Sequence, residues 1–142
     1  MIRQISVFLE NRAGQLADIT GVLAADGIDI RALNIAETAD YGLLRLVVGD
    51  SGKAEEVLKT HGYVASLTDV VAIAVPDRPG ALAEALKVLE SSRMDVQYMY
   101  SIFSRREGKA YMIMKMEDPS AAERILSENG ILVASGSELE IQ

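Results

Sequence analysis

Several residue types that mark particular chemistries are absent or scarce in this chain of 142 residues. It contains no cysteine, which excludes disulfides and thiolate metal sites and fits a reducing compartment. Its single histidine, His61, has no recognisable partner to orient it as a catalytic base, and a place at the end of a helix accounts for it. The motifs HExxH, CxxC and GxSxG do not occur. We therefore expect no catalytic centre, no metal site and no cofactor.

Positive charge and long apolar runs are also in short supply. The chain has 14 Lys and Arg against 21 Asp and Glu, a net charge of −7. This balance disfavours nucleic acid and anionic membranes as partners, because phosphate binding needs clustered Lys and Arg. No apolar run approaches the roughly 20 residues that span a bilayer, and the first residues lack the pattern of a signal peptide. We expect a cytoplasmic protein without a nucleic-acid or membrane partner.

The sequence resembles itself at a displacement of 66 residues. The segment ENRAGQL (10–16) corresponds to PDRPGAL (76–82), and IDI (28–30) corresponds to MDV (94–96). Each half is short for a domain that folds alone, so we expect the two halves to pair.

Both halves predict the same order of secondary structure. In the first, an alternating strand over 4–10 precedes a helix over 15–26; a hairpin around 40–42, a short helix over 53–62 and a returning strand follow. This βαββαβ order is the ferredoxin-like unit, one antiparallel sheet with two helices on one face. We predict an α+β chain of two such units in tandem, residues 1–69 and 70–142, joined without a Gly-, Pro- or Ser-rich linker.

The repeated loop places Gly14 and Gly80 where a helix begins. Helix N-termini carry unpaired N–H groups and partial positive charge, so they attract a carboxylate, and glycine lets it approach. Asn11 and Asp77 could accept a hydrogen bond from an ammonium group, so the loop could hold both ends of a free amino acid. The same residues could instead form an ordinary helix cap and turn. Repetition of the loop at one topological position favours the ligand.

The βαββαβ order with ENRAGQL and PDRPGAL after the first strand resembles the ACT domain family over nearly the whole chain. These are small regulatory modules that bind amino acids and pair side by side. The resemblance implies a ligand between the first loop of one unit and the second strand of its neighbour. The implied contacts in the first half are Asn11, Ala13, Gly14, Gln15, Leu16, Asp29 and Ile30, and in the second half Asp77, Pro79, Gly80, Ala81, Leu82, Asp95 and Val96.

Asp29 and Asp95 could attract the ligand ammonium or a basic side chain, or could simply be solvated strand residues.

The expected function is that of a non-enzymatic amino-acid sensor, paired within the chain and again as a homodimer. Such a protein would act through another protein, a metabolic enzyme or a regulator. The alternative is an interaction module that keeps the fold without a ligand. A small enzyme is disfavoured, because no nucleophile–base pair is present.

Overall fold

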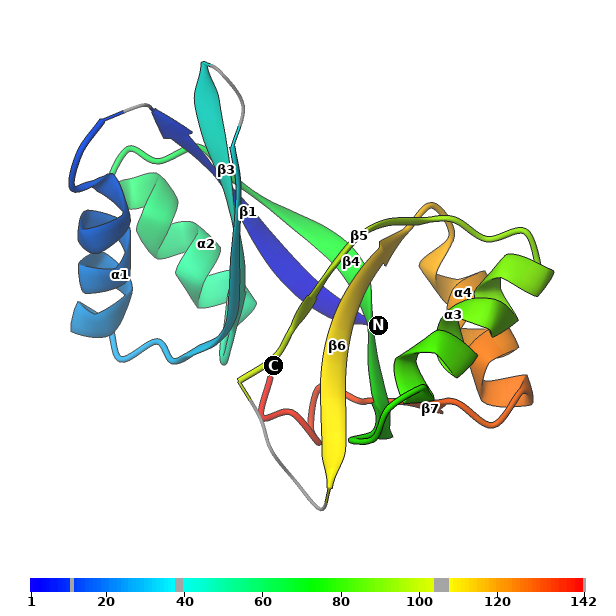
Figure 1. The fold of residues 1–142 in the computed structure, drawn as a ribbon. Helices are drawn as coiled ribbons and strands as arrows, with labels where there is room; N and C mark the ends of the chain where they lie inside the picture. Colours follow the sequence, from blue (N-terminus) through cyan, green and yellow to red (C-terminus); the bar gives the residue numbers. More distant parts are fainter. Residues whose placement is uncertain (11, 38–39, 104–107, 142) are drawn as a thin grey trace. The chain divides into compact units, whose positions relative to one another are not determined.

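The computed structural model describes residues 1–10, 12–37, 40–103 and 108–141. Its helices and strands follow the predicted twofold order (Figure 1). In chain order they are β1 (Ile2–Glu10), α1 (Gln15–Ala25), β2 (Ile30–Glu37), β3 (Tyr41–Val48), α2 (Ser51–Thr60), β4 (Ala65–Pro76), α3 (Ala81–Ser91), β5 (Val96–Ser101), β6 (Lys109–Met116), α4 (Pro119–Glu128) and β7 (Leu132–Val133). The predicted α+β class with tandem ferredoxin-like units is confirmed. Within the described ranges, no helix is both long and apolar enough to cross a membrane.

The two repeats share one strand. The sequence predicts four strands in each, whereas β4 runs unbroken through Ala65–Pro76 and serves as the last strand of the first repeat and the first strand of the second. The physical reason is that this segment has no glycine, and its one proline, Pro76, is its last residue. The described chain therefore forms seven strands where the sequence predicts eight.

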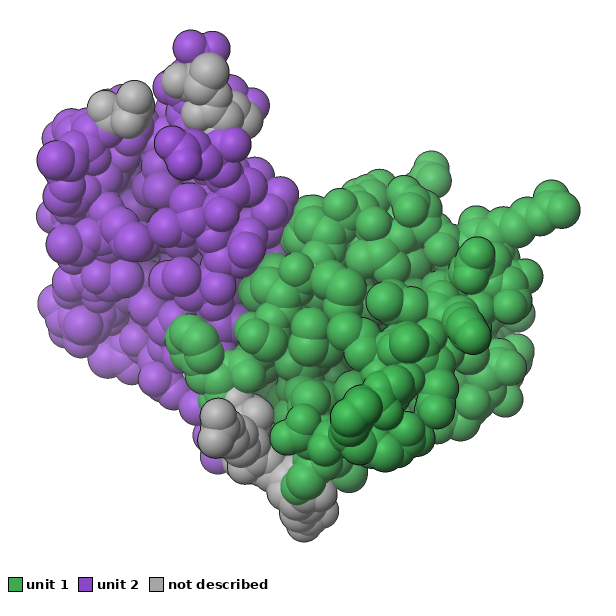
Figure 2. All heavy atoms as spheres, viewed as in Figure 1, with its two compact units in different colours: residues 1–2, 69–139 green, residues 3–68, 140–142 purple. Residues whose placement is uncertain are grey.

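The chain divides into two compact units, coloured separately in Figure 2. Unit 1 contains residues 1–2 and 69–139 and so holds the second repeat. Unit 2 contains residues 3–68 and 140–142 and so holds the first repeat. The division falls inside β4, between Thr68 and Asp69, and residues from near each end of the sequence belong to the unit of the other repeat.

In unit 2 the sheet carries its two helices on one face (Figure 1). Strand β3 lies between β1 and β2 and is antiparallel to both. Alternation along β1 turns Ile5, Val7 and Leu9 toward the core. Helix α1 buries every fourth residue on one stripe, and Ile19 and Leu23 pack against those strand residues.

Unit 1 repeats this design. Strand β6 lies between β4 and β5, antiparallel to both, and the short β7 adds to β4. Helix α3 buries Ala81, Ala85 and Leu89 on one stripe. Strand β6 has methionines at the alternate positions 112, 114 and 116. Met114 and Met116 are fully buried, so these two residues fill the core.

The core of unit 1 gives a test of its packing. Leu89 is 1% exposed and packs between α3 and the sheet, whereas Leu132 on β7 is 46% exposed. Leu89→Ala should lower the free energy of unfolding by about 2–5 kcal/mol, because it removes buried methyl groups and leaves a cavity. Leu132→Ala is the matched control and should cost less than about 1 kcal/mol. Urea denaturation measures both, and equal losses would contradict this placement of the core.

Candidate functional site

The helices begin in two different ways. Helices α2 and α4 start at Asp50 and Asp118, whose side chains each accept a hydrogen bond of 3.1 Å from a first-turn amide. Helices α1 and α3 start instead at Gly14 (φ 83°) and Gly80 (φ 89°), in the left-handed conformation and without any side-chain cap. The uncapped helices are the two that follow the repeated loop. The aspartate caps are therefore on α2 and α4, which do not follow the repeated loop, and α1 and α3, which follow it, have none.

The missing caps leave hydrogen-bond donors available at both loops. The first amides to bond back into the helix are those of Asp18 and Glu84, which donate to the carbonyls of Gly14 and Gly80 at 3.0 Å. Of the amides just before them, that of Ala81 donates to the carbonyl of Arg78 at 3.3 Å, and the others have no helix carbonyl to reach. No described atom lies within 4 Å of a Cβ built on either glycine, so the space over each turn is open. Such a helix start can receive a carboxylate.

The predicted acid of the second loop is not a helix cap. Asp77 donates its backbone N–H to the carbonyl of Gly108 at 2.7 Å, and no described side chain or amide bonds to its carboxylate. The cap interpretation of Asp77 is therefore wrong, and the ammonium interpretation stays a prediction. Its counterpart, Asn11, lies outside the described residues.

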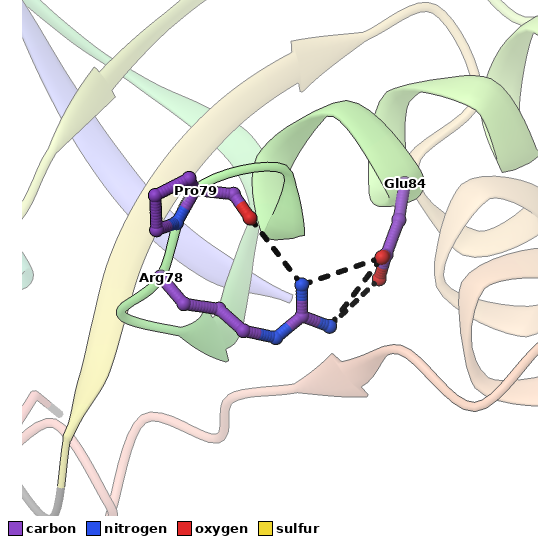
Figure 3. Close-up of polar contacts among 3 residues, drawn as sticks. All are labelled: Arg78, Pro79 and Glu84. Carbon is purple, nitrogen blue, oxygen red and sulfur yellow. Dashed lines mark hydrogen bonds and ion pairs between the residues drawn. The ribbon is translucent and has the colours of Figure 1, made fainter.

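Arg78 ties the second loop to the helix that follows it (Figure 3). Its guanidinium approaches Glu84 on α3 at 3.1 Å and the carbonyl of Pro79 at 3.4 Å. Both side chains of the ion pair are more than half exposed, so it contributes at most about 1 kcal/mol to stability. Its main effect is to fix the loop against the first turn of α3.

The first loop is held differently. Asp18, which occupies the position of Glu84, accepts a hydrogen bond from the hydroxyl of Tyr63. This bond, helped by burial, raises the pKa of Tyr63 above its ordinary value. The corresponding Arg12 makes no side-chain bond within the described ranges. The two loops therefore share a backbone shape but differ in the side chains that brace them.

The starts of the second strands also differ. In unit 2, Arg31 binds the carboxylate of Asp29 at 3.0 Å and that of Glu140 at 3.3 Å. In unit 1 the equivalent of Arg31 is Gln97, and Asp95 makes no ion pair with any described residue. Arg31 is not among the predicted contacts, although its spacing of two residues from Asp29 places both on one side of an extended chain.

The predicted contacts form two separate sets within a unit. The loop set surrounds the first turn of the helix: Ala13, Gly14, Gln15 and Leu16 in unit 2, and Asp77, Pro79, Gly80, Ala81 and Leu82 in unit 1. The strand set follows the last turn: Asp29 and Ile30, and Asp95 and Val96. A helix of 11 residues separates them by roughly 16 Å. The structure brings each set together internally but does not join the two sets of one unit.

No described group of three or more His, Cys, Asp or Glu side chains is arranged to hold a metal ion. Cavities do open at both sets in unit 1. One of about 380 Å³ lies beside the second loop and includes Arg78, Ala81, Glu84 and Lys109. Two more, of about 590 and 600 Å³, lie at the start of β5. These volumes are within the range of small-molecule sites, about 300–1,000 Å³.

Comparison with known proteins gives a family and several relatives. Residues 1–141 match the family described as ACT domain pair. A protein from Bacteroides thetaiotaomicron with a crystal structure is 37% identical, with a TM-score of 0.91 over 98% of this chain and 95% of that one. The acetolactate synthase small subunit of Haemophilus influenzae is 29% identical over 109 residues, which cover 72% of this chain and 66% of the subunit.

Two further relatives extend the comparison. The acetolactate synthase small subunit of Buchnera aphidicola is 27% identical over 73 residues, 51% of this chain and 46% of that subunit. The chain thus spans between about half and two thirds of the curated relatives it matches. The ligand-free regulatory subunit of aspartate kinase from Thermus thermophilus has a TM-score of 0.66 at 18% identity over 90% of this chain and 92% of that one, a likeness of fold.

The left-handed turn before α1 makes a stability prediction with an internal control. Gly14→Ala should lower the free energy of unfolding by about 1 kcal/mol, because alanine resists a φ of 83° even though the added Cβ meets no atom within 4 Å. Gly21 lies inside the same helix, also with open space around it, and its φ is not positive. Gly21→Ala should therefore raise the stability by about 0.5–1 kcal/mol. Urea denaturation should find opposite signs; changes of the same sign would refute the conformational explanation.

Proposed function

The chain belongs to the ACT domain pair family, and from that premise we propose that it is a non-enzymatic regulatory protein that binds a free amino acid. The observation that carries the proposal is the pair of helices that start at left-handed Gly14 and Gly80 without a side-chain cap. The other two described helices, α2 and α4, have an aspartate cap. Each uncapped start offers backbone donors to a carboxylate, the group that all amino acids share.

The ligand lies between the loop set of one unit and the strand set of a neighbouring one. A single unit cannot supply both sets to one small molecule, because a helix of roughly 16 Å separates them. A neighbour is needed to bring a strand set to a loop set. The edge strands β2 and β5 each have one strand partner within the described chain, so each keeps an unpaired side that a second copy can use. We accordingly propose a homodimer.

The partner that receives the signal is an enzyme of amino-acid biosynthesis. The relatives that support this choice are named as an acetolactate synthase small subunit and as a regulatory subunit of aspartate kinase. Both names describe a companion subunit of an enzyme. The alternative is an interaction module without a ligand. It would use the same edge strands, but it would not account for the uncapped helix starts at Gly14 and Gly80.

A thermal-shift screen against the 20 standard amino acids tests the proposal. A ligand of the folded state raises the apparent stability by mass action, about 2.7 kcal/mol at a concentration of 100 Kd. At least one amino acid should raise the melting temperature, and the shift should grow with its concentration. If none does at millimolar concentration, the interaction module is the better description.

Two matched pairs of variants locate the carboxylate. Ala17 and Ala83 are exposed residues at equivalent positions in the first turns of α1 and α3. Proline there removes one amide that the helix does not use and is tolerated in a first turn. Ala17→Gly and Ala83→Gly keep the amide and control for lost helix propensity. Calorimetry should find affinity reduced at least about tenfold in one or both proline variants and retained in the glycine variants.

Full affinity in both proline variants would mean that neither helix start holds the ligand.

A further inference from the structure

All four helices in the described part of the chain end in the same backbone motif. In each, the amide of one residue reaches back three positions, and the amide of the next reaches back five, as in Ile28 to Leu23 at 3.0 Å. The motif needs a residue with positive φ. Helices α1, α2 and α4 supply Gly27, Gly62 and Gly130. Helix α3 supplies Arg93, with a φ of 56°.

Arg93 occupies a backbone position that disfavours it. An L-residue with positive φ is strained relative to glycine. The backbone gains nothing from the arginine, since the amide of Arg93 bonds to Glu90 at 2.9 Å much as that of Gly27 bonds to Ala24 at 3.0 Å. The only other described residue of this kind that is not glycine is Glu140, whose side chain is ion-paired to Arg31.

The side chain of Arg93 does not stabilise the fold either. It is exposed and makes no hydrogen bond or ion pair with any described residue. Backbone strain that no hydrogen bond or side-chain contact within the fold offsets is a feature of functional sites. What remains to explain Arg93 is a contact with something outside the chain.

Arg93 lies at the junction of two cavities. The cavities of about 590 and 600 Å³ at the start of β5 are both lined by Arg93, Met94 and Asp95. The first runs along one face of α3, where its lining includes the apolar Leu86, Met94 and Val96 and the charged Lys87 and Glu90. Half-buried Met94 and Val96 leave apolar surface open at this place.

Opposite charges line this space without neutralising one another. Arg93 and Asp95 border both cavities, yet they form no ion pair, and Asp95 has no other described partner. In unit 2 the corresponding residues are Gly27, which has no charge, and Asp29, whose carboxylate is bound by Arg31. The first repeat therefore lacks the unpaired arginine and aspartate that the second repeat has at this place.

We propose that Arg93 and Asp95 determine ligand choice, with the guanidinium binding the carboxylate and the Asp95 carboxylate binding the ammonium group of an apolar amino acid. The side chain of that amino acid lies in the apolar cavity along α3. This inference rests on the function proposed above and names its ligand class. A carboxylate has about four acceptor sites, so Arg93 and the loop amides of a neighbouring unit can share it. One chain then binds one amino acid, because only the second repeat has the charge pair.

Arg93→Gly separates binding from folding. Without ligand, the variant should melt about 2–4 °C higher than the wild type, because glycine relieves the strain. Its affinity for apolar amino acids should fall at least about tenfold. Gly27→Arg is the matched control: it places the same strain at the equivalent site of unit 2 and should lower the melting temperature without changing the affinity.

Ligand analogues assign the two charges. The probes are L-leucine, leucinol, which lacks the carboxylate, and 4-methylpentanoate, which lacks the ammonium group. The wild type should bind leucine at least about tenfold more tightly than either analogue, at one molecule per chain. Arg93→Gly should reduce the preference over leucinol, because only the loop amides then bind the carboxylate. Asp95→Asn should reduce the preference over 4-methylpentanoate. Asp69→Asn, which alters an exposed acid outside the cavities, should reduce neither.

The outcomes separate this inference from the function on which it rests. If the screen finds an amino-acid ligand but Arg93→Gly binds it as the wild type does, the assignment of Arg93 is wrong and the regulatory function stands. A preference for polar over apolar amino acids, or two bound molecules per chain, likewise overturns this inference alone. If no amino acid binds the wild type, both fail. A lower melting temperature for Arg93→Gly would refute the strain argument.

Discussion

In each repeat the chain passes from its first strand into its first helix through one glycine in the left-handed conformation. That turn sets the positions of the candidate loop and strand contacts. It exposes amides that an aspartate cap would occupy, and it keeps the space above them free of a Cβ. It also starts a helix of 11 residues, which carries the other half of the candidate site to the opposite end of the unit. The proposed ligand would need two units because the helix places the two candidate sets at its opposite ends.

The two repeats keep this backbone and differ in their charged side chains. Arginine stands two residues after the strand acid in the first repeat, where it binds Asp29. It stands two residues before the acid in the second, where Arg93 leaves Asp95 unpaired. Backbone geometry is preserved because the ladders and helix ends constrain every residue together. The side chains at the surface are under no such constraint, so duplicated sites can take different tasks.

Most of the fold could be predicted from the sequence, because apolar spacing and glycine positions report directly on strands, helices and helix ends. The boundaries of α1, expected over 15–26 and found over Gln15–Ala25, follow from such local signals. The single strand β4 was missed because two adjacent strands and one long strand have the same alternation. The site was predicted as residue types in a loop. Its actual arrangement depends on pairings such as Arg78 with Glu84, which spacing alone cannot distinguish from a solvated charge.

The continuous strand β4 limits how far this chain could be shortened. Its first four residues belong to the unit of the first repeat, and the remaining residues belong to the other unit. The boundary between the two units thus lies inside a continuous strand and not in a linker. A half-length chain cut there would expose a severed strand and lose the residues that its sheet takes from across the cut. We therefore expect the two repeats to fold together and not as separate half-length chains.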